Sequence, residues 1–458
     1  MAAVTSKADA NAIARHFGGG LLFAVALAAF IGGLEYAYAN RMAPRFGYLG
    51  YVYHEPAAEW MFATYLMLLI TALFLPRRTD RFSGFAVWFL YAAVVVPVAT
   101  VPLYNSTRDP GDTFLFACYC AAIWAGVALI IRRRQTPTIV PVRLRTDSRL
   151  LWTGIVLVSL ATYVSVYVSF GISFNVVNVF DVYDTRLDYR DGLASSGPLV
   201  GYLIFNQGNV VNPLLMAIGV FRRRCMPVAL GVIGQLILYS TAGYKTVLIS
   251  IPLCIALAFV LRKRKQFSGI TVFVGATLLV WGAIIIDRIA PALGIVDLFV
   301  SRVFIMAGHL VPFFLQVYDG QPWALWDYSF LGPFVTTPYT MSPGFHVGLV
   351  AFGQPEVQAN ASLFADGYAN LGLVGIAIEA AFLVLLLVFV DSASRGIPIA
   401  IVIPTALLPV FAIANASPFT ALFSLGFALM FVLFAVHPRS APERAPEDAP
   451  ALPLAVTR

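Results

Sequence analysis

Charged residues are scarce in this chain of 458 residues, because Asp, Glu, Lys and Arg together make up only 12% of it. A soluble globular domain carries about twice that share. Hydrophobic residues make up 60% of the chain, and its mean hydropathy is +0.82. Apolar runs of about 20 residues, each long enough to cross a hydrocarbon core as a helix, recur along the whole length. The sequence therefore predicts an all-α, polytopic integral membrane protein.

Cysteine and the common nucleotide motifs are also scarce or missing. The four cysteines fall in or beside apolar runs, so no disulfide framework or zinc spacing is visible. No Walker loop and no dinucleotide-binding glycine pattern are found, and His309 and His346 are too isolated to predict a metal site. We therefore expect no cofactor and no metal.

The net charge of +7 does not indicate a nucleic-acid partner, because the basic residues form short clusters between apolar runs. Twelve spans are predicted in a single transmembrane domain that extends over residues 17–436. They cover residues 17–40, 60–75, 82–103, 113–131, 150–171, 198–221, 227–241, 246–261, 267–286, 367–390, 397–415 and 419–436. The segment 437–458, rich in Pro, Ala and charge, is expected to be a disordered cytoplasmic tail.

Counting Lys and Arg on alternate sides of these spans gives 22 on one side and 8 on the other. Cytoplasmic loops are the ones enriched in Lys and Arg, so the count predicts that both termini are cytoplasmic. The stretch 288–366 then forms a large outer loop, and after Arg302 no Lys or Arg follows until Arg395. Within it, 298–318 is apolar enough for a thirteenth span, but it contains Arg302, His309 and Pro312. We interpret it as an interfacial or re-entrant helix.

Several cations are expected near the outer membrane surface, where each has two interpretations. Arg186 and Arg190 lie among four aspartates in the outer loop 173–197, where they could reach lipid phosphates or pair with those aspartates. Lys245, in a short outer turn, could simply extend to the interface or hold a diphosphate. For Arg302 a functional role is favoured, because a charge within so apolar a helix is costly without a partner.

Polar residues also occur inside predicted spans. For Asn206, Gln207, Asn209 and Asn212 the favoured interpretation is hydrogen bonding between helices. Glu379 is expected deep in the cytoplasmic half of its span, as a neutral, hydrogen-bonded side chain without a catalytic role.

The stretch 360–375, NASLFADGYANLGLVG, runs directly into a span. Here the chain resembles the Wzy-type O-antigen polymerases, also called oligosaccharide repeat unit polymerases, whose large periplasmic loop ends in a similar Asn-rich helix start with a terminal Gly-x-x-Gly. The turn GYKT at 243–246 looks like the Gly-x-Arg-type turn of that family with Lys in place of Arg, and the stretch from Arg302 to Gly308 adds to the likeness.

The resemblance implies a GT-C-like fold in the bacterial inner membrane and a metal-independent glycosyltransferase that joins undecaprenyl-diphosphate-linked oligosaccharides into a surface polysaccharide. It implies these lipid-linked sugars, membrane lipids, and chain-length regulator and flippase proteins as partners. Cations at the outer headgroup plane would stabilise the departing diphosphate. The residues expected to do so, or to bind the substrate, are Arg186, Arg190, Lys245, Arg288, Arg302, Asn360, Tyr318 and Tyr368.

One departure from the related O-antigen ligases concerns the general base. The ligases have a His before the terminal glycine motif, where this chain has Ala361 and Ser362. Asp366 and His309 are the catalytic candidates that remain.

Two other functions fit the same composition. A lipid-linked oligosaccharide flippase would share the spans and the internal cations but would not need so long an outer loop. A GT-C glycosyltransferase that uses a polyprenyl-phosphate sugar commonly has acidic pairs in the first outer loop. Glu55 and Glu59 resemble such a pair only weakly.

Overall fold

The structure is a computed structural model that describes residues 2–105, 108–133, 148–171, 189, 192–193, 196–264, 266–360 and 362–439, without the side chains of residues 2–18 and 78. These residues are mostly helical. The first half contains α1 (Ala2–Ala37), η1 (Tyr38–Met42), α2 (Ala43–Phe46), η2 (Gly47–Leu49), α3 (Ala58–Ala72), β1 (Arg78–Thr79), α4 (Phe82–Leu90), η3 (Tyr91–Val95), α5 (Val96–Thr100), α6 (Pro102–Asn105), α7 (Pro110–Arg133), α8 (Ser148–Phe170), α10 (Pro198–Asn206), η4 (Gln207–Val211) and α11 (Asn212–Arg222).

The second half contains α12 (Cys225–Ala242), α13 (Lys245–Leu261), β2 (Phe267–Ser268), α14 (Gly269–Ile289), η5 (Pro291–Leu293), η6 (Val296–Ile305), α15 (Met306–His309), α16 (Val311–Tyr318), η7 (Gly332–Phe334), α17 (Pro343–Phe352), α18 (Leu363–Ser394), α19 (Ile399–Ile413), α20 (Pro418–Phe423) and α21 (Phe427–Val436). The two strands pair antiparallel, with Arg78 opposite Ser268 and Thr79 opposite Phe267.

The prediction of an all-α polytopic membrane protein is confirmed. Ten helical segments of the described chain are long and apolar enough to cross a membrane. Nine of them coincide with predicted spans, and the other three predicted spans coincide with the shorter apolar helices α3, α13 and α19. The tenth long segment is Val296–Tyr318, which contains the stretch 298–318 that the sequence predicts to be an interfacial or re-entrant helix.

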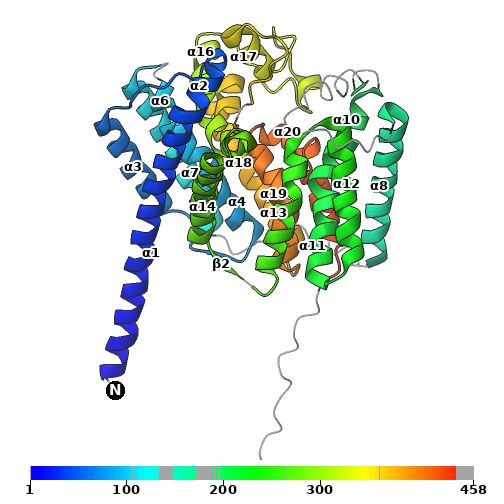
Figure 1. The fold of residues 1–458 in the computed structure, drawn as a ribbon, viewed down its shortest axis with the longest axis horizontal. Coiled ribbons are helices and arrows are strands. Elements are labelled where there is room, and N and C mark those ends of the chain that lie inside the picture. The colour runs from blue at the N-terminus through cyan, green and yellow to red at the C-terminus, as the bar shows by residue number, and fades with distance from the viewer. Residues whose placement is uncertain are drawn as a thin grey trace, which may run out of the picture.

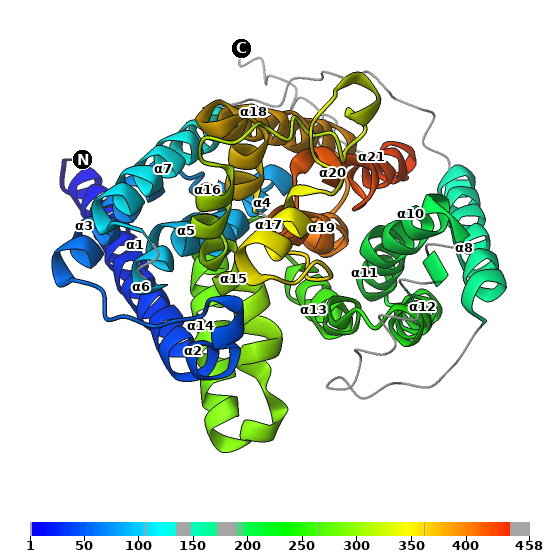
Figure 2. The same cartoon turned by 90° about the horizontal axis from the view of Figure 1, so that it is seen from above.

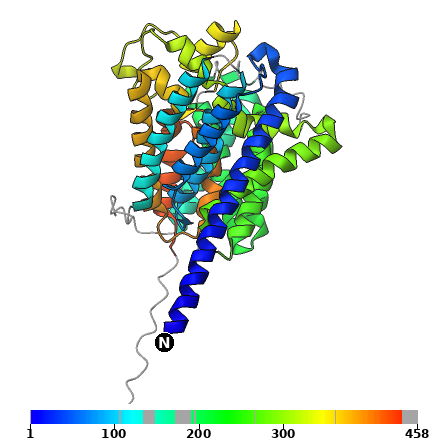
Figure 3. The same ribbon diagram turned by 90° about the vertical axis from the view of Figure 1, so that its left-hand side faces the viewer.

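The bundle has two distinct ends. One end carries the N-terminus of α1 and the strand β2, and the other carries α2, α6, α16 and α17 (Figure 1, Figure 3). We call the second the cap end, because residues 319–360 and 362 cover it, and we call these residues the cap. The first we call the basic end, since α7 and α11 finish there with Arg133 and Arg222.

At the centre of the bundle lies the helix formed by α4, η3 and α5. Almost every residue from Phe82 to Thr100 is buried. Gly308 of α15 packs so tightly on this helix that an added Cβ would lie 2.1 Å from the carbonyl oxygen of Pro97. This close approach fixes the segment η6–α15–α16 against the core.

The segment η6–α15–α16 runs differently from its neighbours. Seen from above, α12 and α13 appear nearly end-on, whereas α15 and α16 follow one another across the molecule (Figure 2). The preceding helix α14 and the start of η6 form a hairpin that projects from the side of the bundle next to α2 (Figure 2, Figure 3). The segment therefore leads from the end of α14 across the bundle to the cap.

The long segment α18 is two helices separated by a sharp turn. Leu371 and Gly372 have non-helical backbone angles, and Gly372 has φ 60° and ψ −145°, which is accessible essentially to glycine alone. Across this turn, an added Cβ at Gly375 would lie 2.0 Å from the carbonyl oxygen of Gly367. Residues eight apart in a straight helix are about 12 Å apart along the axis, so the chain folds back on itself here.

The turn in α18 is also where the cap docks. The break leaves the carbonyl groups of Ala369 and Asn370 without their helical partners. The backbone N–H of Ala324 donates to the first at 3.1 Å, and that of Leu325 donates to the second at 3.3 Å. The cap is thereby held by backbone hydrogen bonds to a broken helix.

Two of the four polar residues predicted to join helices, Gln207 and Asn212, belong to one network, whereas Asn206 and Asn209 donate to the carbonyl groups of Phe423 and Leu425 at 3.0 and 3.3 Å. Gln207 donates to Asn212 at 2.8 Å and to Ser159 at 3.0 Å. Asn212 donates to Gln235 at 3.2 Å, and Gln235 donates to Ser250 at 2.8 Å. These bonds link α8, η4, α11, α12 and α13, in agreement with the favoured interpretation of Gln207 and Asn212.

Candidate functional site

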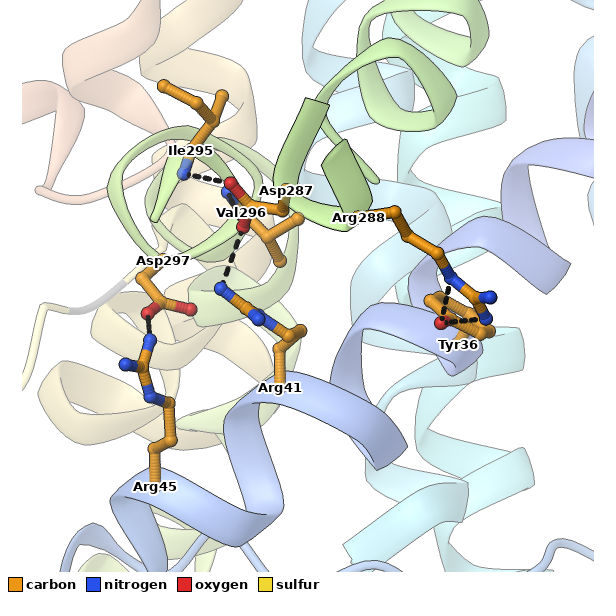
Figure 4. Close-up of polar contacts among 8 residues, drawn as sticks. All are labelled: Tyr36, Arg41, Arg45, Asp287, Arg288, Ile295, Val296 and Asp297. Carbon is orange, nitrogen blue, oxygen red and sulfur yellow. Dashed lines mark hydrogen bonds and ion pairs between the residues drawn. The ribbon is translucent and has the colours of Figure 1, made fainter. Parts of the chain in front are cut away.

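Two ion pairs organise the cap end beside α2. Asp287, near the end of α14, accepts from the Arg41 guanidinium at 3.1 Å. The same carboxylate also accepts from the backbone N–H groups of Ile295 and Val296, at 2.6 and 3.0 Å (Figure 4). Asp287 thus accepts the free backbone N–H groups at the start of η6, and its ion pair with Arg41 links α14 to η1.

The second pair joins Arg45 of α2 to Asp297 of η6 (Figure 4). Arg288 points away from both pairs, and its guanidinium lies over the ring of Tyr36 and donates to its hydroxyl group (Figure 4). Of the predicted diphosphate ligands, Arg288 is therefore held elsewhere.

A pocket of about 590 Å³ opens beside the Arg45–Asp297 pair. Its lining brings together three cations, Arg45, Lys245 and Arg302, with the single carboxylate of Asp297. The remaining lining residues are Phe46, Pro291, Ala292, Gly294 and Leu298. We call it the cationic pocket. The predicted cations Lys245 and Arg302, 57 positions apart in the sequence, thus line the same space.

Arg302 is the unusual member of this pocket. Within the described part of the chain, its guanidinium makes no hydrogen bond and no ion pair, whereas Arg45 is paired with Asp297. A guanidinium carries five donors and stays charged, so leaving it without a partner in apolar surroundings is costly. Lys245 is the first residue of α13, so the helix N-terminus adds to the positive potential. The pocket suits a multiply charged anion.

An apolar groove of about 430 Å³ continues from the cationic pocket, and the two share Lys245, Leu298 and Arg302. Its lining comes mainly from α13, α14 and η6, with residues of α4 and α19 also contributing. Its lining reaches from Lys245 at the start of α13 to Arg264 just beyond its end. Since α13 has 17 residues, the groove is about 25 Å long.

A second polar cluster surrounds the break in α18. Asp366 accepts from the Tyr328 hydroxyl, and Asn370 donates to Asp366 at 2.8 Å and to the Tyr328 hydroxyl at 3.0 Å. Glu379 accepts from the Trp326 indole at 2.8 Å and from Ser417 at 3.0 Å. Burial and the two nearby carboxyl groups raise the pKa of Tyr328 well above its usual range, so it stays a donor.

This cluster corrects the expectation for Glu379. A straight helix would carry Glu379 far toward the basic end, but its partner Trp326 belongs to the cap. The turn at Leu371 and Gly372 reverses the chain, and Glu379 therefore lies at the cap end. Asp366 is buried in the same cluster, and α19 lies between α18 and α13 in the view from above (Figure 2). Asp366 is thus not part of the cationic pocket lining.

His309 is fully buried, and its ring stacks on Tyr51 with the centroids 3.6 Å apart. Both ring nitrogens have hydrogen-bond partners: Nδ1 lies 3.2 Å from the Tyr38 hydroxyl and Nε2 lies 3.1 Å from the carbonyl oxygen of Leu49. In this arrangement the imidazole has no free nitrogen for a substrate proton. Its contacts anchor the loop after η2 on α15.

The remaining predicted residues lie in three places. Arg186 and Arg190 are outside the described residues. Tyr368 packs edge-on against Trp323, and Asn360 donates to the sulfur of Met306 at 3.4 Å. Tyr318 is the last residue of α16, and its side chain is buried against the cap. Its hydroxyl group has no partner among the described residues. These last three belong to the cap and its contacts, away from the cationic pocket.

Sequence reasoning missed Asp297, Arg45 and the pairing of Asp287 with Arg41. Arg41 and Arg45 were counted only as outer-surface charges. No local signal would have found these pairs, because their partners are 246 and 252 positions apart in the sequence.

Within the described residues, no group of three or more His, Cys, Asp or Glu side chains could hold a metal ion. No family model, curated protein or solved structure matches this chain.

Proposed function

We propose that this protein is a metal-independent membrane glycosyltransferase of the Wzy type, which joins undecaprenyl-diphosphate-linked oligosaccharides at the outer face of the bacterial inner membrane. In this proposal the chain has twelve spans, a GT-C-like arrangement and both termini in the cytoplasm, with Val296–Tyr318 re-entrant. The observation that carries it is the cationic pocket at the head of a long apolar groove.

The groove and the pocket match the two halves of such a lipid. A branched isoprenoid chain gains free energy from an apolar lining, and aliphatic and aromatic residues from α4, α13, α14 and α19 supply it. Its diphosphate carries more than one negative charge, and Arg302 has unused donors to offer. A neutral lipid would leave the guanidinium of Arg302 unpaired.

The proposed chemistry is a glycosyl transfer. A hydroxyl group of the acceptor sugar attacks the anomeric carbon of the donor, the bond from that carbon to the diphosphate oxygen breaks, and the lipid diphosphate leaves. Arg302 and Lys245 stabilise the charge that develops on the leaving oxygen. The hydroxyl proton must pass to a base within hydrogen-bonding reach.

Asp297 is the carboxylate placed to act as that base. It lines the cationic pocket, and its Oδ1 has no hydrogen-bond partner among the described residues, while its Oδ2 pairs with Arg45. The earlier candidates are less well placed, since both nitrogens of His309 are engaged and Asp366 lies in the α18 cluster. We therefore propose that Asp297 is the general base that accepts the proton of the acceptor hydroxyl group.

The test is a reconstituted elongation assay. Purified protein in liposomes receives an undecaprenyl-diphosphate-linked oligosaccharide, and products are sized by gel electrophoresis. We expect products longer than one repeat unit from the wild type and a loss of them in Lys245→Ala and Arg302→Ala. Translocation of the lipid without elongation would instead identify a flippase, and elongation that requires a polyprenyl-monophosphate sugar would identify the other glycosyltransferase class.

A further inference from the structure

A separate pocket of about 680 Å³ lies between α16 and the cap. Its walls come from α16, from the loop that follows it and from α17. The lining consists of Phe313, Gln316, Val317, Gln321, Pro322, Pro338, Tyr339, His346, Val350 and Ala351. We call it the cap pocket. Its volume is within the range of about 300–1,000 Å³ that small-molecule sites occupy.

Three neutral hydrogen-bonding side chains of this lining are unused. Within the described residues, the side chains of Gln316, Gln321 and His346 form no hydrogen bond. Burial lowers the pKa of His346, so its ring is neutral at pH 7 and offers one donor and one acceptor. The two glutamine amides and the neutral imidazole therefore offer a ligand both hydrogen-bond donors and hydrogen-bond acceptors.

The lining contains no charged side chain, and the charge around it is negative. No Lys or Arg occurs between Arg302 and Arg395, whereas the cap contains Asp319, Asp327 and Glu356. An anionic ligand would find no counter-charge here and would be repelled by these carboxylates. The cap pocket therefore selects against the diphosphate that suits the cationic pocket.

An aromatic wall completes the pocket. Tyr339 is fixed by a 2.6 Å hydrogen bond from its hydroxyl to the carbonyl oxygen of Pro322, and His346 packs edge-on against its ring with centroids 4.9 Å apart. A rigid ring bounded by neutral amides is the combination that binds a sugar, because the C–H face of a pyranose packs on the ring and its hydroxyl groups bond the amides.

We propose that the cap pocket binds a neutral saccharide, through Gln316, Gln321 and His346 and against the ring of Tyr339. This deepens the proposed function and rests on it for the source of the sugar, which is a residue of the oligosaccharide whose diphosphate occupies the cationic pocket or of its acceptor. The pocket sets which oligosaccharides are elongated, and it takes no part in the bond-breaking step.

The experiment uses the full-length protein in nanodiscs and saturation-transfer difference NMR. The probes are maltotetraose, N-acetylated chitotetraose, mannotetraose and rhamnotriose as neutral saccharides, and sialyllactose as a charged one. The variants are Tyr339→Ala and the double variant Gln316→Ala with Gln321→Ala. The matched control is Gln358→Ala, because Gln358 is an exposed glutamine of the cap that does not line the pocket.

We expect the wild type to bind at least one neutral probe and to bind it better than sialyllactose. Both variants should weaken that binding by about tenfold or more, since the double variant removes the amides that bond the sugar and Tyr339→Ala removes the ring on which it packs. Gln358→Ala should bind like the wild type, and undecaprenyl diphosphate should bind equally to all of them, which shows that the variants are folded.

The inference is overturned if the wild type binds none of the neutral probes, if it prefers sialyllactose, or if the variants bind as the wild type does. Elongation is measured on the same samples, so the two proposals can fail separately. If the wild type elongates but binds no saccharide probe, only the proposal of a saccharide site in the cap pocket is contradicted. If it binds a saccharide but does not elongate, only the proposed glycosyl transfer is contradicted.

Discussion

The cationic pocket and the cap pocket lie at the same end of the molecule but differ in chemistry. The first gathers Arg45, Lys245 and Arg302 and opens into an apolar groove. The second is lined by amides and rings, in a stretch of chain without Lys or Arg. One substrate that carries a lipid, a diphosphate and neutral sugars would need both environments. The difference in charge between the two pockets separates the place for the diphosphate from the place for the sugars.

Replacing Arg302, which has no ion pair within the described residues, should have the largest effect. Arg302→Ala is expected to lower turnover about 100-fold or more, because it removes the main stabilisation of the leaving diphosphate. Saccharide binding to the cap pocket should not change. The matched control is Arg288→Ala, since Arg288 is held on Tyr36 and not in the pocket. Equal losses in both variants would contradict the assignment, as measured by initial rates of elongation.

The second largest loss of turnover is expected from replacing Asp297, the carboxylate of the cationic pocket. Asp297→Asn keeps the side-chain shape but cannot accept a proton, so we expect turnover to fall about 100-fold at most, with little change in KM. The comparison variant is Asp366→Asn. A larger loss of turnover in Asp366→Asn than in Asp297→Asn would move the base to the α18 cluster.

A bulky side chain in the groove should weaken the binding of the lipid chain and leave saccharide binding unchanged. Gly275 lines the groove and has open space around its Cβ position, so Gly275→Leu would place a side chain where the isoprenoid lies. We expect undecaprenyl diphosphate to bind about tenfold more weakly, because apolar contact area is lost. Gly282→Leu is the control, since Gly282 is on the same helix, has the same open space and does not line the groove. Equal binding by both variants would argue against the groove.

On the cap side, Gly372→Ala should loosen the docking of the cap. Alanine at φ 60° and ψ −145° is strained, and its Cβ would lie 3.1 Å from the ring of Trp323. We expect a loss of about 1–3 kcal/mol in stability and a smaller loss in turnover than any variant of the cationic pocket. Thermal unfolding measures the first. A variant as stable as the wild type would show that the turn is not needed.

The smallest effect is expected at the first outer loop. Glu55 and Glu59 are exposed, so Glu55→Gln with Glu59→Gln should change elongation less than about twofold. An elongation rate that falls as far as in Asp297→Asn would favour the polyprenyl-phosphate-sugar enzyme over the proposed one.

Much of the fold follows from the sequence. Every predicted span coincides with a helix, because the length of an apolar run and its flanking charges are local properties. Lys245 and Arg302, both selected from the sequence as diphosphate ligands, line one pocket in the structure, and their role stays a prediction. Each was selected for being a cation in apolar surroundings at the expected depth, and that signal needs no knowledge of contacts.

The parts that could not be predicted depend on the path of the backbone. Glu379 was misplaced because the turn at Gly372 reverses a run that hydropathy makes look like one straight helix. The Arg45–Asp297 pair joins residues 252 positions apart, so nothing local reveals that one cation of the pocket is neutralised. For the same reason, the engagement of both His309 nitrogens was not visible from its neighbours in the sequence.

The groove lining includes Val260 and Leu279, which are 59% and 46% exposed on the outside of the bundle. On the proposed function, a lipid chain can slide in sideways from the bilayer without ever passing through water. Encounter with the enzyme is then a two-dimensional search, and its frequency depends on how many substrate molecules share each unit of membrane area. Elongation rates should accordingly follow the substrate-to-lipid ratio of a vesicle and not the total substrate concentration of the suspension.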